Sequence, residues 1–245
     1  MKLKEIFDQL TYGELSQISI GGGAAGTVRT EDHPKLVAHV NLGLTALYKR
    51  FNLKKGQFKL VLQPSMTMYA LNAKYASTNT RSREAVKFIN DTGMPFRDDL
   101  LKVENVYSDT GYEFGVNNPA DPFSMNTPSQ RMLVVPADIV ARADWLPDEM
   151  KTSSLTVFYR ANHPKIEAED VEPEDLEIDL PDTHLEALLL FIASRVHTPI
   201  GIGGEDNTGN TYFQKYELAC QELENKNLQI DHATQYDRLQ KGGWV

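Results

Sequence analysis

The sequence is poor in cysteine: Cys220 is the only one in 245 residues. A single cysteine cannot form a disulfide within the chain, and no cysteine-based zinc site can be built from it. Cys220 follows Tyr216 and Ala219 at helical spacing, so we expect a small buried apolar residue rather than a nucleophile. The sequence therefore gives no indication of thiol or disulfide chemistry.

Long apolar runs and an excess of positive charge are also missing. The longest runs, such as residues 188–193, fall far short of the roughly 20 residues that a membrane-spanning helix requires. The first residues reach Asp8 without the apolar stretch of a signal peptide, so we expect a protein that is made in the cytosol and stays soluble. The net charge of −9 argues against a broad basic surface for gripping nucleic acid. An acidic surface can still meet DNA in a channel through which the DNA slides.

Helical patterns occur near both ends of the chain. Four segments have the apolar spacing of amphipathic helices: residues 3–15, 34–51, 183–198 and 211–224. Asp32 precedes Pro34 at a position suited to capping the second helix. Thr183 and Glu186 have the spacing of a capping box at the start of the third. A loop of roughly a dozen residues joins the last two helices, so we expect them to pack antiparallel, with the second helix as a third member.

The middle of the chain has the patterns of an antiparallel β structure. Strands are predicted at residues 58–62, 100–106, 112–116, 131–135 and 155–159, and a short helix at residues 82–90. Asp109 and Gly111 suit a tight turn between the second and third of these strands. Connections rich in Pro and Asn favour a small antiparallel sheet or sandwich.

Together these patterns predict an α+β fold with a discontinuous organisation. Residues 1–55 and 180–228 would form a helical bundle, residues 56–179 a β-rich insertion, and residues 229–245 an extended C-terminal arm. Seven of the eleven residues from 167 to 177 are acidic. We interpret this stretch as a solvated connector. The alternative is an acidic wall that faces a partner or a DNA path.

The sequence contains no motif or spacing that is typical of a catalytic, nucleotide-binding or metal-binding site. The Gly-rich stretch Gly21–Gly26 lacks the Gly-Lys-Ser/Thr ending of a phosphate loop and the buried strand before it. Asp32, His33 and His39 are the best candidates for a set of metal ligands. The two histidines are six residues apart, however, and this spacing places them on different sides of a helix. We therefore predict no catalytic residues, no cofactor and no metal.

Three segments carry a resemblance to a known family. Residues 154–166 read Ser-Leu-Thr-Val-Phe-Tyr-Arg-Ala-Asn-His-Pro-Lys-Ile, and residues 178–181 read Ile-Asp-Leu-Pro. Residues 212–223 read Tyr-Phe-Gln-Lys-Tyr-Glu-Leu-Ala-Cys-Gln-Glu-Leu. They resemble the last strand of the β insertion, the run that follows it and the closing helix of the head-to-tail adaptor (connector) proteins of tailed bacteriophages, which include the podovirus tail tubular protein A. The resemblance covers most of the chain, with residues 73–127 unmatched.

The resemblance implies a structural role without catalysis. Such adaptors form a ring, often of twelve copies, beneath the portal protein, and they seat the tail nozzle or tail tube. Double-stranded DNA passes through the lumen without specific binding, which an acidic lumen favours by repelling phosphate. The protein would be assembled in the host cytoplasm and would reside in the neck or tail of the virion. The alternatives are another neck or tail component and, less favoured, a small-molecule enzyme that uses Gly21–Gly26 and His33.

The resemblance also implies that the C-terminal arm docks on the portal. The arm is polar apart from Ile230, Tyr236, Leu239, Trp244 and Val245. A bundle of this size does not need the arm in order to fold, and buried Trp and Tyr side chains dominate interface energies. We therefore predict that these five residues bind the portal. The alternative is a disordered terminus.

Overall fold

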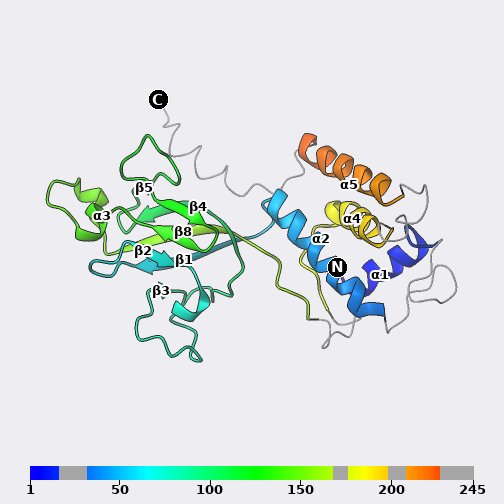
Figure 1. Ribbon diagram of the computed structural model, residues 1–245, viewed down its shortest axis with the longest axis horizontal. Coiled ribbons are helices and arrows are strands. Elements are labelled where there is room, and N and C mark those ends of the chain that lie inside the picture. The colour runs from blue at the N-terminus through cyan, green and yellow to red at the C-terminus, as the bar shows by residue number, and fades with distance from the viewer. Residues whose placement is uncertain (17–31, 168–175, 198–207, 227–245) are drawn as a thin grey trace. The chain divides into compact units, whose positions relative to one another are not determined.

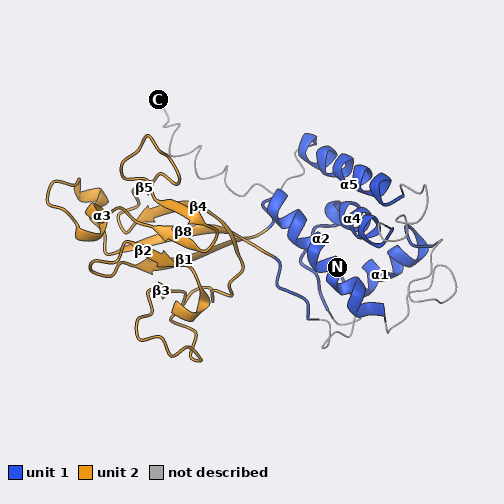
Figure 2. Ribbon diagram, in the orientation of Figure 1, with its two compact units in different colours: residues 1–53, 163–245 blue, residues 54–162 orange. Residues whose placement is uncertain are grey.

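The structure is a computed structural model that describes residues 1–16, 32–167, 176–197 and 208–226. These residues contain five α-helices and two antiparallel sheets, which confirms the predicted α+β class (Figure 1). The chain divides into two compact units: residues 1–53 with 163–245, and residues 54–162 (Figure 2). In the described part of the chain, no helix has the length and hydrophobicity needed to cross a bilayer.

The first unit is helical, and its helices lie where the apolar spacing predicts them. They are α1 (Leu3–Tyr12), α2 (His33–Arg50), α4 (Leu185–His197) and α5 (Thr208–Asn225). The buried residues of α1 are Leu3, Ile6, Phe7 and Leu10, the four that the spacing places on one face. Helix α4 is buried on most of its circumference because it contacts α1, α2 and α5.

Close contacts fix how the neighbours of α4 pack on it. A Cβ atom at Gly43 of α2 would lie 2.6 Å from Leu188 Cδ1 and 3.1 Å from Phe191 Cδ1, so a larger residue would force these two side chains of α4 to shift. On the other side, the ring of His197 stacks on that of Tyr212 at 4.9 Å. The ring of Phe191 meets that of Tyr216 at 5.3 Å. The end of α4 therefore lies beside the start of α5, and the two helices run in opposite directions.

One predicted helix cap lies at its predicted position, and the other is wrong. Asp32 is the N-cap residue of α2, but its side chain makes no capping hydrogen bond; one carboxylate oxygen accepts instead from Lys35 Nζ at 2.9 Å, and the other is buried without a hydrogen-bond partner. Thr183 lies inside the 3₁₀ turn η4 (Asp182–His184) that leads into α4, so it is not a cap residue. Its hydroxyl lies 3.0 Å from His184 Nδ1.

The second unit is built on antiparallel sheets. The larger sheet has the order β3-β1-β8-β4-β5. Its strands are β1 (Lys55–Val61), β3 (Ile89–Asn90), β4 (Leu100–Ser108), β5 (Glu113–Phe114) and β8 (Ser154–Ala161). The smaller sheet pairs β2 (Met68–Ala70), β7 (Met132–Val134) and β6 (Asn126–Ser129). Every predicted strand is present, and Gly111 closes the β4–β5 turn with φ +90°, which glycine adopts without strain.

The predicted helix at residues 82–90 is wrong. This segment is a loop that ends in β3, where Ile89 pairs with Leu60 of β1. Phe88 and Ile89 are buried in the core of the β unit, whereas Val86 is exposed. Burial of this adjacent pair against the sheet overrides the weak local preference for a helix. The short helix α3 (Ala137–Ala141) and the 3₁₀ turns η2 (Ala73–Tyr75) and η3 (Asp148–Met150) are not predicted from the sequence.

The described ends of the connector lie against the helical unit. Asn41 of α2 donates from Nδ2 to the carbonyl of Ile166 and accepts from its N–H, both at 2.9 Å. Tyr48 donates its hydroxyl hydrogen bond to the carbonyl of Asp179. The N–H of Ile178 donates to the Met1 carbonyl at 2.8 Å. Residues 163–167 and 176–179, assigned from the sequence to the β insertion, are thus tied to α2 and to the start of the chain.

Candidate functional site

Two of the predicted functional segments lie outside the described residues. These are the Gly21–Gly26 stretch and the C-terminal arm with Ile230, Tyr236, Leu239, Trp244 and Val245. The described part of the acidic connector is limited to its two ends. The surfaces of the helical unit and of the β unit therefore supply the geometry on which function is argued.

The histidines considered for chemistry occupy packed positions. His33 lies with its ring 4.9 Å from that of Phe7, and burial lowers its pKa against the opposing effect of Asp32. Burial also lowers the pKa of His39, and the charge of Arg195 adds to that effect. Among the described residues, no three His, Cys, Asp or Glu side chains come together as a metal would require. Asp32, His33 and His39 are not brought into one site.

Cys220 lies on the inner face of α5, where it is fully buried. Burial raises the pKa of its thiol, with a smaller opposing effect from the hydrogen bond of Tyr216. A thiol that stays protonated is a poor nucleophile. The prediction of a buried apolar role for Cys220 is confirmed.

A groove with a volume of about 460 Å³ runs along the hairpin of α4 and α5 in the helical unit. We call it the hairpin groove. It is lined by Thr183, Glu186, Ala187 and Leu190 of the α4 side and by Lys215, Leu218, Ala219, Glu222, Leu223 and Lys226 of the α5 side. Leu218 stands on its rim with 60% of its surface exposed, and Phe213, on the same helix, is 47% exposed. A large exposed apolar side chain at the rim of an apolar groove suits a contact with another protein surface.

The charges of the hairpin groove are balanced. Glu186 and Glu222 contribute two negative charges, and Lys215 and Lys226 two positive ones. Lys226 pairs with Glu222 at 3.0 Å. A groove of mixed charge and apolar lining has no preference for a phosphate or a carboxylate, and it suits a protein surface of mixed charge.

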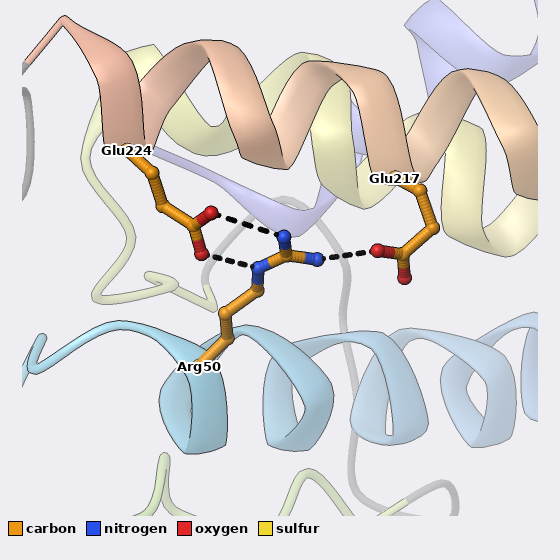
Figure 3. A network of polar contacts seen from close by, with 3 residues as sticks. All are labelled: Arg50, Glu217 and Glu224. Atoms are coloured by element: carbon orange, nitrogen blue, oxygen red, sulfur yellow. Dashed lines mark hydrogen bonds and ion pairs between the residues drawn. The ribbon is translucent and has the colours of Figure 1, made fainter.

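An ion-pair network holds α5 in place behind this groove (Figure 3). Arg50, at the end of α2, binds Glu224 through two parallel hydrogen bonds, from Nε at 2.7 Å and from Nη2 at 3.2 Å. Its Nη1 donates to Glu217 at 2.7 Å. The bond from Arg50 lowers the pKa of Glu224, and the bonds to Glu224 and Glu217 raise that of Arg50. The fork geometry fixes α5 relative to α2, because two acids seven residues apart meet one guanidinium.

We expect Arg50→Met to lower the free energy of unfolding by about 1 kcal/mol, since a bidentate pair at a partly exposed site contributes about that much. Urea denaturation measures the change. The matched control is Lys226→Met, which removes the exposed pair with Glu222 and should cost only a few tenths of a kcal/mol. Equal losses in the two variants would show that the network does not fix α5.

In the β unit, one carboxylate ties together three consecutive residues. Asp109, in the β4–β5 turn, accepts from Thr152 Oγ1 at 3.0 Å and from the N–H groups of Ser153 and Ser154 at 3.2 and 3.1 Å. Burial acts to raise the pKa of Asp109, but hydrogen bonds from Ser154, Thr152 and Ser153 outweigh it and lower the value to about 2. An acid that is always ionised near neutral pH is a structural anchor rather than a proton donor.

The low pKa of Asp109 predicts an acid-sensitive contribution to stability. The pKa is 3.8 for the free group and about 2 in the fold, so the stabilisation is complete above about pH 5 and is lost as the pH falls toward about 2. The free-energy difference between the unaltered chain and Asp109→Asn should therefore be constant from pH 7 to about 5 and shrink below about 4. Denaturation series at several pH values measure it. A difference that grew toward low pH would contradict the assignment.

Sequence reasoning did not single out Leu218 and Phe213. Leu218 lies opposite the inward stripe of α5 formed by Tyr216, Cys220 and Leu223, whereas Phe213 lies beside that stripe, with its ring 5.8 Å from that of Tyr216. For Leu218 the available signal was its phase, because a large apolar residue opposite a complete buried stripe marks a second contact surface.

Comparison with known proteins adds no relative. No protein-family model matches this chain, and no curated protein matches it. The geometry described above, with its exposed groove and its anchored hairpin, therefore has to carry the functional conclusion.

Proposed function

We propose that this protein is a structural component of a tailed-phage virion, a head-to-tail adaptor that works by assembly and docking rather than by catalysis. The resemblance of residues 154–166, 178–181 and 212–223 to that family supports the proposal. So does the division of the chain, in which both ends contribute to a helical unit and the middle forms a β unit. In this proposal the helical unit is a bundle that serves neighbouring subunits as well as itself.

The hairpin groove is the observation that carries the proposal. Its apolar lining and the exposed Leu218 need a partner, and the partner we assign is the helical unit of a second copy. The outer face of α2 offers a complementary ridge, since Leu42 is 48% exposed and Lys35 and Lys49 stand exposed on the same helix. An exposed leucine on the outer face of a helix matches an apolar groove whose two acids and two lysines balance in charge. Two different surfaces that fit each other generate a closed ring when the rotation between copies closes.

The remaining partners follow from the same role. The C-terminal arm would dock on the portal through Ile230, Tyr236, Leu239, Trp244 and Val245. The other side of the ring would seat the tail nozzle or tail tube protein. Double-stranded DNA would pass through the lumen without specific binding, and the ring would be assembled in the host cytoplasm and retained in the virion.

The mass of the full chain in solution, alone and mixed with purified portal, tests the proposal. A ring of twelve 27.6 kDa chains has a mass of about 330 kDa. Sedimentation or native mass measurement should find such a species, alone or only on the portal. A chain that stays monomeric with portal present, and whose melting temperature rises with a small molecule, would favour an enzyme instead.

A further inference from the structure

A loop of the β unit carries an excess of positive charge. It comprises residues 76–88 and leads from η2 to β3, the strand at one edge of the larger sheet (Figure 1). We call it the basic loop. Arg81, Arg83 and Lys87 belong to it and Lys74 of η2 precedes it, whereas Glu84 is the only acid in the loop. The loop is therefore cationic in a chain whose net charge is −9.

Contacts within the loop bring the cations together and leave two of them free. Ser82 Oγ donates to the carbonyl of Lys74 at 2.6 Å, so the residues on either side of Ser82, Arg81 and Arg83, lie next to η2. Lys74 Nζ pairs with Glu84 at 3.1 Å. Both arginine side chains are exposed, and neither guanidinium has a hydrogen bond or an ion pair to any residue that the structure describes.

Polar contacts fix the backbone that presents the two arginines. The side-chain oxygen of Asn79 accepts from the N–H of Arg81 at 3.1 Å, and the Asn79 carbonyl accepts from Lys87 Nζ. Asp91, which follows β3, accepts from the N–H of Thr78 at 3.0 Å and from its hydroxyl at 2.5 Å. A ligand that binds the arginines therefore does not have to order the loop first.

The acids at the base of the loop do not cancel its charge. Asp91 is 1% exposed and is occupied by hydrogen bonds from residues 77, 78 and 96. Asp98 accepts from the first N–H of η2 at 2.7 Å. Arg97 precedes Asp98, and Arg131 donates to the Asp98 carbonyl at 3.4 Å. In the basic loop and the residues just described, six cations thus face three acids.

The loop lacks the apolar surface that a protein partner would require. The core of a protein interface is apolar and poor in charge. Val86, 49% exposed, is the one large apolar side chain that residues 76–88 leave exposed. A phosphate backbone needs no apolar lining, because Arg and Lys contacts supply most of the energy of non-specific binding. A guanidinium also binds phosphate oxygens through two parallel hydrogen bonds.

The aromatic ring nearest the loop is not available for stacking on bases. Tyr75 of η2 stacks on Phe88 with the ring centres 4.5 Å apart, and Lys74 Nζ lies 4.6 Å from the centre of the Tyr75 ring. Proteins that bind single strands without sequence preference stack bases on exposed aromatic rings. The loop therefore suits a duplex, whose phosphates are accessible without unstacking.

We propose that the basic loop binds the phosphate backbone of double-stranded DNA without sequence preference. Arg81 and Arg83 each bind a phosphate, and Lys74 and Lys87 add to the positive potential. Since the rest of the chain is acidic, the contact is confined to this loop and is weak. The proposal uses only the β unit and does not depend on the adaptor role or on the hairpin groove.

The salt dependence of binding tests the proposal. The probe is a fluorescein-labelled duplex of about 20 base pairs, titrated with the full chain at several salt concentrations and followed by fluorescence anisotropy. A second duplex of unrelated sequence should bind with the same affinity. Arg81→Gln with Arg83→Gln removes two phosphate contacts, so it should weaken binding and reduce the slope of log K against log salt concentration by about 2.

A matched control removes the same charge elsewhere in the β unit. Arg142→Gln with Lys102→Gln changes two exposed cations outside the basic loop and should alter the slope by less than about 0.5. Equal losses in the two double variants would refute the assignment to this loop. Polyglutamate that displaces the duplex as strongly as unlabelled duplex does would favour an acidic protein partner instead. A lack of saturable binding up to about 0.3 mM chain at about 50 mM salt would overturn the proposal altogether.

Discussion

A Leu218→Glu variant is expected to remain folded and to lose the ring. Leu218 is 60% exposed, so its replacement leaves the core of the helical unit intact and changes its free energy of unfolding by less than about 0.5 kcal/mol. In a contact between copies the new carboxylate would be taken out of water among Ala187, Leu190 and Leu223, and the nearby Lys215 and Lys226 would offset only part of that cost. Such burial costs about 2 kcal/mol or more at every interface of the ring. Sedimentation velocity should therefore find the monomer where the unaltered chain forms a ring.

The chain offers a matched control and an independent second test. Gln221→Glu places the same charge on an exposed position of α5 that does not line the hairpin groove, and the ring should persist. Leu42→Glu alters the proposed ridge on α2 and should abolish the ring as Leu218→Glu does. A Leu218→Glu chain that assembles to the same mass as the unaltered chain would show that the groove is not the contact.

Removal of residues 229–245 is expected to leave both units folded and to abolish docking on the portal. The buried side chains of α1, α2, α4 and α5 pack on one another, so the helical unit has a core of its own. The apolar side chains of the C-terminal arm are then available for a partner. The truncated chain should keep the circular dichroism spectrum and melting temperature of the full chain and fail to co-sediment with portal.

A single substitution tests whether Trp244 is a specific anchor or whether the arm binds through non-specific apolar contacts. Trp244→Ala should weaken docking by about 2 kcal/mol, or roughly 30-fold in affinity, if the indole fills a central pocket. Gln240→Ala, in the same arm, should have no measurable effect. Docking by the truncated chain with unchanged affinity would refute the role of the arm.

Strong periodicity made most of the fold predictable from the sequence. The spacing of Leu3, Ile6, Phe7 and Leu10 defines α1, and these four are its buried residues. The strict alternation of buried and partly exposed residues in β8 (Ser154–Ala161) likewise defines the central strand of the larger sheet. Where one face of an element is buried, the period of the pattern and the period of the structure have to agree.

The errors occur where local signals compete with tertiary contacts. Asp32 lies at the N-cap position of α2 but makes no capping hydrogen bond and pairs with Lys35. Thr183 lies within the 3₁₀ turn η4, where its hydroxyl is 3.0 Å from His184 Nδ1. The segment at residues 82–90 forms a loop and a strand because Ile89 reaches the edge of the large sheet. Pairing partners that are distant in the chain are invisible to a local pattern.

The candidate surface was the least predictable feature. Leu218 contributes nothing to the buried stripe of α5. Such a surface is formed by apolar residues that the fold leaves exposed. Periodic patterns in the sequence mainly indicate which residues are buried.

The adaptor proposal assigns this chain to a tailed phage, and cryo-electron microscopy of mature particles of that phage tests the central claim most directly. The account predicts a ring of density between portal and tail into which the helical unit and the β unit both fit, repeated once per subunit. A neck occupied entirely by other proteins, with this chain absent from the particles, would contradict it.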